Sequence, residues 1–311
     1  MCNYFFNFMK SSSFVNINGD LKQNKFTIIL YLFLNFLQNI YYSLFKKKFR
    51  FINFVPSKKK YFFKNDQSIS RKLCGVFWKN INWNILNYYL GKFNICEIGP
   101  GDGNYFKKDI SIKKKLIKKY TGYDVVENKN WKKQNKKNFI LKKFDGYSFQ
   151  KIISKNNNLF LSQSCLEHVR YDLKFFHDIK KKFKKSKKKS ILIKCVPSPF
   201  CLFTYLTHGY RQYNTKNLNK ISNVLGSNNL FVIKLGSFFL NFEHLKNTTL
   251  PLIFKKKDMM KKQSKSYYNR INNLIVKNNT GSLFFSSFII IIGFINFNKL
   301  EKEDVIKKIF S

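Results

Sequence analysis

From residue 94 onward the chain alternates short apolar runs with amphipathic stretches of helical period. Such apolar runs are typical of parallel strands that are buried on both faces, and the stretches between them are typical of crossover helices. The pattern therefore predicts an α/β domain built on a mostly parallel sheet. We expect seven strands, at residues 94–98, 120–124, 139–144, 159–162, 190–195, 230–239 and 284–295.

The clearest helix is predicted after the fourth apolar run. Its apolar residues are spaced by three or four positions, so they form one helix face, and lysines fill its last turns, as the helix dipole favours. By contrast, residues 255–279 are rich in Lys and Asn, which indicates a polar excursion on the surface. The apolar face of the helix consists of Leu166, Val169, Leu173, Phe176, Ile179 and Phe183.

Residues 1–60 differ from the rest and are interpreted as an N-terminal extension, with the main domain at 61–311. Within the extension, residues 26–45 form a nearly continuous apolar and aromatic stretch with lysines on both sides. Its length matches a membrane span of about 20 residues. Asn35, Gln38, Asn39 and Ser43 interrupt it, so an interfacial helix or a helix packed on the main domain fits equally well. There is no small-residue cleavage site, so a secretory signal is not indicated.

A glycine-rich loop follows the first predicted strand. Gly99, Gly101 and Gly103 stand at alternate positions, which lets the backbone turn tightly and approach a bound nucleoside. A helix is expected to begin after them and to turn its free N–H groups toward the site. The dinucleotide fingerprint requires a further glycine where this chain has Asn104, and the Gly-Lys-Ser/Thr ending of a P-loop is absent.

The segment from Glu97 to Gly103 resembles the first motif of class I S-adenosylmethionine-dependent methyltransferases. Matches to three further motifs follow in the family's order: Asp124 at the end of the second strand, Asp145 after the third, and a Leu-Glu-His-Val sequence after the fourth. The resemblance implies a Rossmann-like three-layer sandwich. In that fold the sheet has seven strands, and the last is antiparallel and inserted between its neighbours.

The resemblance also implies S-adenosyl-L-methionine as the cofactor, bound where the strands end. Asp124 lies 21 positions after Gly103, which is the spacing of a ribose-binding carboxylate in nucleotide-binding βαβ units. Asp145 and Gly146 match the family's contact with the adenine amino group, and Glu97 is expected to place the methionine part or to orient the loop. The predicted cofactor residues are Glu97, Gly99, Gly101, Gly103, Asp124, Asp145, Gly146, Ser162 and Gln163.

Two histidines are candidate proton acceptors. His168 follows the fourth strand, and His208 belongs to an insertion at 197–213 that overhangs the acceptor pocket in this fold. Together with His208, the insertion residues Tyr205, Tyr210 and Arg211 are predicted to contact the acceptor. As alternatives, His168 caps or packs a helix, and the insertion packs on the 26–45 helix. No metal site is predicted, since the six cysteines are scattered without a C-x-x-C pair; they indicate a reducing, cytoplasmic compartment. Two of them, Cys96 and Cys195, fall in strand runs and are expected in the core.

The chain carries 59 Lys and Arg against 16 Asp and Glu, for a net charge of +43. Such a charge would ordinarily indicate a nucleic acid or an anionic membrane as a partner. Lys, Asn, Ile, Phe and Tyr are all abundant together, however, and A/T-rich codons encode them, so mutational bias explains much of the excess. The Asn/Asp-Pro-Pro-Tyr/Phe motif of base-amino methylation is also absent after the fourth strand.

The resulting hypothesis is an O-methyltransferase for a small-molecule, sugar or lipid-linked acceptor, with a peripheral membrane contact through 26–45 as an option. An RNA-binding protein with a methyltransferase-like shell and a membrane-associated scaffold without activity stay open as alternatives. Cofactor binding separates the enzyme from the scaffold, and a steep salt dependence of RNA affinity would identify the RNA-binding protein.

Overall fold

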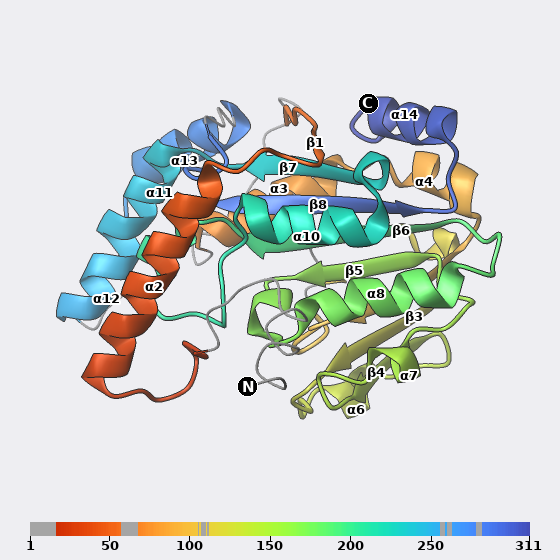
Figure 1. Cartoon of the computed structure of the whole chain (residues 1–311), viewed down its shortest axis with the longest axis horizontal. Coiled ribbons are helices and arrows are strands. Elements are labelled where there is room, and N and C mark those ends of the chain that lie inside the picture. The colour runs from red at the N-terminus through yellow and green to blue at the C-terminus, as the bar shows by residue number, and fades with distance from the viewer. Residues whose placement is uncertain are drawn as a thin grey trace.

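The computed structural model describes residues 17–56, 68–104, 106, 110, 112–255, 259, 263–277 and 282–311. In this part of the chain an eight-stranded sheet forms a middle layer between helices (Figure 1). The strands are β1 (Arg50–Phe51), β2 (Phe93–Ile98), β3 (Ile117–Asp124), β4 (Phe139–Lys143), β5 (Leu159–Gln163), β6 (Ser190–Pro197), β7 (Leu230–Leu235) and β8 (Phe288–Ile295).

The strand order is β1-β7-β8-β6-β5-β2-β3-β4. All neighbours are parallel except β8, which pairs antiparallel with both β6 and β7. The predicted α/β class and the inserted antiparallel last strand are therefore confirmed. The predicted count of seven is wrong by one strand, because β1 comes from the N-terminal extension and pairs Arg50 with Phe231 of β7. A strand of two residues is too short to show an alternating pattern.

Several predicted boundaries also change. The last strand begins at Phe288 instead of residue 284, and the second begins at Ile117 instead of residue 120. The strand expected at 230–239 ends at Leu235, since the Ser237 side chain accepts a hydrogen bond from the N–H of Leu240 and caps α11 (Phe238–His244). The helix expected from Leu166 is split into a short 3-10 turn, η2 (Leu166–His168), and α8 (Asp172–Phe183). After the glycine loop, Asn104 and Phe106 are helical, and other residues of the helix predicted there lie outside the described ones.

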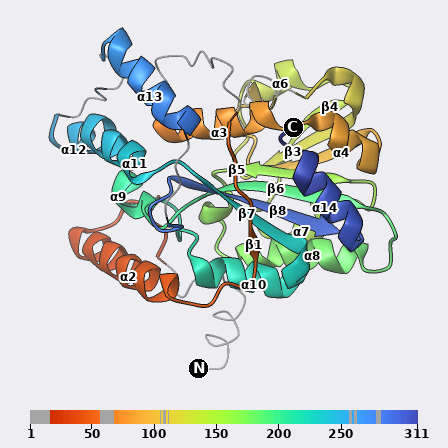
Figure 2. The same cartoon turned by 90° about the horizontal axis from the view of Figure 1, so that it is seen from above.

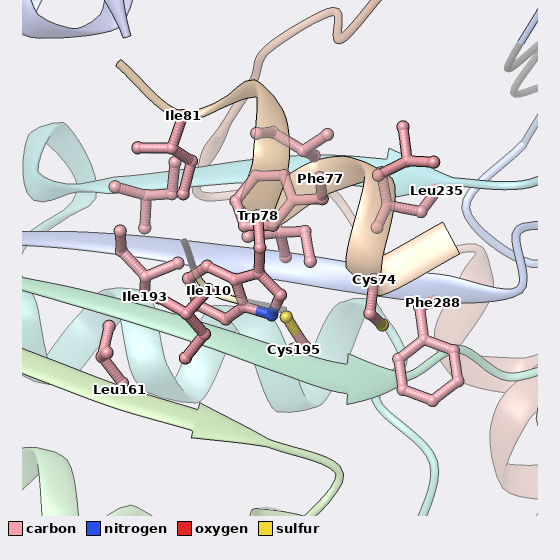
Figure 3. Close-up of a cluster of buried hydrophobic side chains, with 14 of the residues drawn as sticks. Cys74, Phe77, Trp78, Ile81, Ile110, Leu161, Ile193, Cys195, Leu235 and Phe288 are labelled. Carbon is pink, nitrogen blue, oxygen red and sulfur yellow. The ribbon is translucent and has the colours of Figure 1, made fainter. Parts of the chain in front are cut away.

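Helices cover both faces of the sheet, as the view from above shows (Figure 2). In the apolar core on one face, Trp78 of α3 lies against the sheet beside Leu161, Ile193 and Cys195 (Figure 3). Cys96 and Cys195 are both fully buried, as predicted. One face is covered by α3 (Ile69–Asn80), α4 (Trp83–Leu90), α13 (Lys265–Lys277) and α14 (Lys299–Lys308), and the other by α7 (Phe149–Ile152), α8 and α10 (Thr215–Leu225).

The expectation of a surface excursion at 255–279 is wrong for its central part. Residues 265–277 form α13, whose Ile271 and Ile275 are fully buried in the core. Tyr268 joins them at helical spacing. These apolar positions are sufficient for packing, although the Lys and Asn around them dominate the composition.

The apolar stretch of the extension forms α2 (Lys25–Ser43), which Asn24 caps by accepting a hydrogen bond from the N–H of Thr27. Its inward face is polar: Asn39 donates to Gln212 at 3.3 Å and accepts from Asn214 at 3.1 Å. The helix packs against α9 (Cys201–Tyr205) and α10. Among the described residues, no helix is both long and apolar enough to cross a membrane. The predicted boundary between residues 60 and 61 lies outside the described residues.

Candidate functional site

The glycine-rich loop after β2 adopts a backbone that favours glycine. Gly99, Gly101 and Gly103 have φ angles of 75°, 57° and 77°, in the left-handed region. A Cβ on Gly99 would lie 2.5 Å from the Cβ of Cys165, and a Cβ on Gly103 would lie 2.6 Å from the Cδ1 of Leu141. A Cβ on Gly101 would meet no atom of the described chain within 4 Å. The outer glycines are therefore required for packing, whereas the middle one borders open space.

Hydrogen bonds to the end of β3 and to a short helix hold this loop in place. The N–H of Gly101 donates to Oδ2 of Asp124 at 3.0 Å. From α6 (Trp131–Gln134), the indole of Trp131 donates to the carbonyl of Gly101 at 2.8 Å, and the amide of Gln134 donates to the carbonyl of Asp102 at 2.6 Å. Trp131 and Gln134 could not be predicted from the sequence, because a four-residue helix has no periodic signal. Because it is tied on both sides, the loop presents a preformed surface.

Asp124 ends β3 beside the loop and is half-buried. While Oδ2 accepts from Gly101, Oδ1 accepts from the N–H of Val125 at 2.8 Å, so the backbone orients the carboxylate. Val125 and Val126 follow and are exposed, which gives this rim an apolar surface that the sequence analysis did not identify. The ribose-binding role of Asp124 stays a prediction.

Asp145 lies exposed just after β4 and fixes the turn that leads to α7. Its Oδ1 accepts from the N–H groups of Tyr147 at 2.9 Å and Ser148 at 2.7 Å. Hydrogen bonds from Ser148, and then the one from Tyr147, lower the pKa of Asp145 to about 2. Gly146 has a φ of 82°, and its Cβ would lie 3.0 Å from Val125, so the ends of β3 and β4 meet here.

The end of β5 completes this edge. Ser162 is buried, and its hydroxyl has no hydrogen-bond partner among the described residues. Gln163 accepts a hydrogen bond from the indole of Trp78 at 2.8 Å. Ser164, with a φ of 47°, turns the chain so that Cys165 contacts Gly99. Since β4, β3, β2 and β5 are neighbours in the sheet, the predicted cofactor residues after these strands lie along one edge.

Glu97 is enclosed by the core instead of facing this edge. It is 1% exposed, and the hydroxyl of Tyr120 donates to its Oε2 at 2.5 Å. Burial raises the pKa of Glu97 to about 7, although the Tyr120 hydrogen bond and the charge of Lys194 partly oppose the shift. Burial likewise lowers the pKa of Lys194, on β6, to about 7. The predicted contact of Glu97 with the methionine part stays a prediction.

The two candidate proton acceptors lie together beyond β5. The ring centroids of His168 and His208 are 4.5 Å apart, and the ring planes are at 87°. Asp20, from the extension, places Oδ2 2.6 Å from Nδ1 of His168 and Oδ1 3.6 Å from Nδ1 of His208. Burial lowers the pKa of His168, but the Asp20 hydrogen bond and the charge of Glu167 outweigh it, so the pKa is raised overall. Sequence analysis missed Asp20 because 148 positions separate it from His168.

The topology and the glycine loop together decide the fold. Without β1, the strand order is β4-β3-β2-β5-β6-β8-β7, the glycine loop follows a central strand, and β8 is antiparallel between β6 and β7. The antiparallel last strand inserted between its neighbours is what the sequence resemblance implied. The chain has the class I methyltransferase fold.

Several solved methyltransferase structures align with this chain at low sequence identity and with TM-scores below 0.5. An S-adenosylmethionine-dependent methyltransferase from Archaeoglobus fulgidus is 19% identical, with 72% of this chain and 94% of that chain covered and a TM-score of 0.42. One from Mesorhizobium loti is 10% identical, with coverages of 68% and 97% and a TM-score of 0.41. The plantazolicin methyltransferase BamL, in complex with S-adenosylhomocysteine, is 12% identical, with coverages of 74% and 85% and a TM-score of 0.39. No family model matches the sequence, and no curated protein matches it significantly. The fold assignment therefore depends on strand order and register.

In the insertion of this methyltransferase fold, Arg211 does not face an acceptor. Its side chain is fully buried, and Nη1 lies 3.0 Å from Oδ1 of Asp172, which is also fully buried. The guanidinium further donates to the carbonyls of Val169 at 2.6 Å and Arg170 at 2.7 Å. The prediction that Arg211 binds the acceptor is wrong, because these contacts tie the insertion to the start of α8.

The other insertion residues are half-buried. The Tyr205 ring stacks on His208 with centroids 5.4 Å apart, and the N–H of Tyr210 donates to the carbonyl of Glu167 at 2.7 Å. The hydroxyl of Tyr31, on α2, donates to the carbonyl of His208 at 2.9 Å. The alternative that the insertion packs on the apolar helix is therefore confirmed, and acceptor contacts by Tyr205, His208 and Tyr210 stay predictions.

Replacing Glu97 by glutamine should change how stability depends on pH. Because the pKa of Glu97 is raised from 4.5 to about 7, the folded protein holds a proton that the unfolded chain releases between these values. Wild-type stability therefore falls through this window by up to about 1.4 kcal/mol for each pH unit. The glutamine amide can still accept from Tyr120 and does not titrate, so the stability of Glu97→Gln relative to wild type should grow from pH 4.5 to 7. Urea unfolding at pH 5 and pH 8 checks this, and an equal difference at both would contradict it.

Proposed function

We propose that the protein transfers a methyl group from S-adenosylmethionine to an acceptor bound at the carboxyl edge of the sheet. The main support for this proposal is the loop from Gly99 to Gly103. Hydrogen bonds to Asp124 and Trp131 fix the loop, and the space next to Gly101 is open. When bound, the cofactor supplies an electrophilic methyl carbon. The protein then has to hold a nucleophile in line with that carbon and keep both in place.

The residues along this edge fit a nucleoside with an amino-acid arm. Asp124 offers an oriented carboxylate to the ribose hydroxyls. The exposed side chains of Val125 and Val126 offer apolar surface to the flat base, and the charged Asp145 can accept a hydrogen bond from its amino group. The buried hydroxyl of Ser162, without a partner among the described residues, is available as a further contact.

Titration calorimetry with the full chain tests this function. We expect S-adenosylmethionine and S-adenosylhomocysteine to bind with micromolar affinity. NAD should not bind, since Asn104 occupies the position of the last glycine in the dinucleotide fingerprint. If the folded protein bound neither S-adenosyl ligand, the proposed methyltransferase function would be refuted. A steeply salt-dependent affinity for RNA in that case would favour the RNA-binding alternative.

For the acceptor, we favour a lipid-linked molecule, because α2 has its polar side inward. The residues buried on α2 are Tyr31, Asn35, Gln38, Asn39 and Tyr42. The opposite face is apolar and exposed. Its members include Phe26 at 73%, Ile29 at 65%, Phe33 at 56% and Leu37 at 46% exposed. An apolar helix face that is exposed to water is unfavourable. It becomes favourable when a lipid layer or another protein surface covers it.

The apolar surface continues beyond α2. Figures 1 and 2 show α2, α11 and α12 (Leu250–Lys255) at one end of the sheet, which is where β7 leads into α11. Aromatic contacts bridge them, with Phe36 and Phe203 centroids 5.9 Å apart and Phe200 and Phe238 centroids 6.0 Å apart. On α11 and α12 the exposed apolar residues are Phe238, Phe239, Phe242, Leu250, Leu252, Ile253 and Phe254.

A cavity and a set of lysines support a lipid surface as the partner of this face. The cavity, of about 690 Å³, lies between α2 and the sheet edge and is lined mainly by apolar side chains such as Phe36, Phe200 and Phe284. Exposed lysines lie at both ends of α2. Lys22 precedes the helix, Lys25 is its first residue, and three lysines follow it at 46–48. Lysines beside an apolar helix face favour anionic lipid headgroups, each contributing about 1 kcal/mol near the surface.

Replacing Phe33 by aspartate should weaken membrane binding at least tenfold, since a charge would have to enter the apolar layer. Co-sedimentation with phosphatidylcholine vesicles containing phosphatidylglycerol measures the binding. The matched control is Leu300→Asp, which alters an even more exposed apolar residue on α14, away from α2, and should bind as wild type does. Failure of the wild type to bind, with dimerisation instead, would show that a second copy covers this face.

A further inference from the structure

We propose that Asp20, His168 and His208 form a binding site for one divalent transition-metal ion. Each residue can offer one ligand atom, and these three atoms lie within 4.8 Å of one another. The residues come from three separate segments: the extension, the turn after β5 and the insertion after β6. Neither the cofactor loop nor the carboxylates beside it belong to this cluster.

The spacing of the ligand atoms suits a single ion. Transition metals bind imidazole nitrogens and carboxylate oxygens at about 2.0–2.2 Å, so two ligand atoms on one ion lie about 3.0–4.3 Å apart. Oδ2 of Asp20 is 2.6 Å from Nδ1 of His168, and Oδ1 of Asp20 is 3.6 Å from Nδ1 of His208. The three ligand atoms lie within 4.8 Å of one another, so small side-chain movements bring one carboxylate oxygen and two imidazole nitrogens onto a single ion.

A buried carboxylate behind the cluster supports the metal site independently of the ligand spacing. Glu167 is fully buried, and neither of its carboxylate oxygens has a hydrogen-bond partner among the described residues. Its Oε1 lies 3.9 Å from Nε2 of His168 and 3.8 Å from Nε2 of His208. An unpartnered buried carboxylate is costly. Metal-ligating histidines typically donate their second ring N–H to such a carboxylate, which fixes the ring orientation. With Nδ1 of both rings on the ion, both Nε2–H groups would face Glu167.

The backbone around the cluster permits this close approach only with glycine at two positions. A Cβ on Gly19 would lie 2.6 Å from the backbone nitrogen of His208, and a Cβ on Gly209 would lie 2.6 Å from the carbonyl oxygen of Glu167. The N–H of Gly19 donates to the carbonyl of Gly209 at 2.7 Å, and the N–H of Gly209 donates to Oδ1 of Asp20 at 3.0 Å. Asp20 is thus aimed at the imidazoles by the backbone.

The donor set indicates the class of ion. Two imidazoles with one carboxylate favour a transition-metal ion such as Zn²⁺ or Co²⁺, whereas Mg²⁺ and Ca²⁺ favour all-oxygen sites. The side chains of Asp20, His168 and His208 are each about one third exposed, so solvent or a ligand can complete the coordination. In this arrangement neither imidazole keeps a free ring nitrogen, so the histidines are ligands and not the proton acceptors expected from the sequence. The ion would also fasten the extension to the rim.

Calorimetry of tag-free full-length protein with Zn²⁺ and Mg²⁺ tests the site without any activity assay. We expect one Zn²⁺ for each chain at micromolar or lower dissociation constant, and no Mg²⁺ binding at that level. Co²⁺ should give visible ligand-field absorption that Zn²⁺ abolishes. Amide exchange of residues 17–21 should slow with Zn²⁺, because Asp20 becomes a ligand.

Variants identify the ligands. Asp20→Asn and His208→Ala should each abolish stoichiometric binding, and Glu167→Gln should weaken it about 10–100-fold, as loss of an outer carboxylate does. The control His177→Ala removes an exposed histidine of α8 and should bind as wild type does. Zn²⁺ binding that survives Asp20→Asn, or no stoichiometric binding by the wild type, would overturn the proposal. Neither outcome depends on whether the protein binds S-adenosylmethionine.

Discussion

Replacing Gly101 by valine should reduce S-adenosylmethionine binding at least 100-fold while the protein stays folded. A Cβ at this position meets no atom of the described chain within 4 Å, so the new side chain does not disturb the packing of the loop. It instead fills the space that the proposed cofactor needs. The φ of 57° adds a strain of about 1–2 kcal/mol for a residue with a Cβ. Calorimetry gives the affinity, and urea unfolding gives the stability.

Gly91 provides a matched control for this experiment. It has a φ of 67°, its Cβ would also meet no atom of the described chain within 4 Å, and it lies before β2 at the opposite end of the strand from the loop. Gly91 also has a ψ of −163°, a conformation that only glycine readily adopts, so Gly91→Val carries a backbone strain of its own without touching the site. It should bind the cofactor as wild type does. If Gly101→Val kept near wild-type affinity, the loop would not be the cofactor site. If both variants lost affinity equally, the cause would be backbone strain and not the valine side chain filling the cofactor site.

The fold was predictable because its signals are local. Seven strands are marked by apolar runs, and the loop from Gly99 to Gly103 is marked by glycines at positions that require left-handed φ angles or close packing. Asp124 was found in the same way, because its distance from the loop along the chain reflects one βαβ unit. The structure places it within 3.0 Å of the Gly101 nitrogen.

Features that depend on contacts between distant segments could not be read from the sequence. The pairing of Asp20 with His168 and the addition of β1 to β7 join the extension to residues far along the chain. The orientation of α2 was also hidden, because its polar residues are too few to indicate that they face inward. Arg211 was misassigned for a related reason: an arginine in a polar, aromatic insertion suggests a ligand contact, and only the fold brings it to Asp172.

The buried pair of Arg211 and Asp172 leads to the largest expected effect on stability. Asp172→Asn keeps the shape of the side chain but leaves a fully buried guanidinium without its counter-charge. Removing one partner of a buried ion pair costs about 3–5 kcal/mol. The hydroxyl of Tyr213 also donates to Oδ2 of Asp172 at 2.7 Å, so the carboxylate joins two segments. Urea unfolding should show the loss as a lower midpoint with an unchanged slope.

A surface pair gives the comparison that separates burial from charge. Arg50 and Glu303 form an ion pair with side chains 50% and 40% exposed, and Glu303→Ala should cost less than about 1 kcal/mol. If Asp172→Asn does not fold, Tyr213→Phe removes only the hydrogen bond to Asp172 and should cost about 1–3 kcal/mol. Similar small losses for Asp172→Asn and Glu303→Ala would show that water reaches the Arg211 guanidinium. The insertion would then be free to leave α8, and Arg211 would again be available to an acceptor.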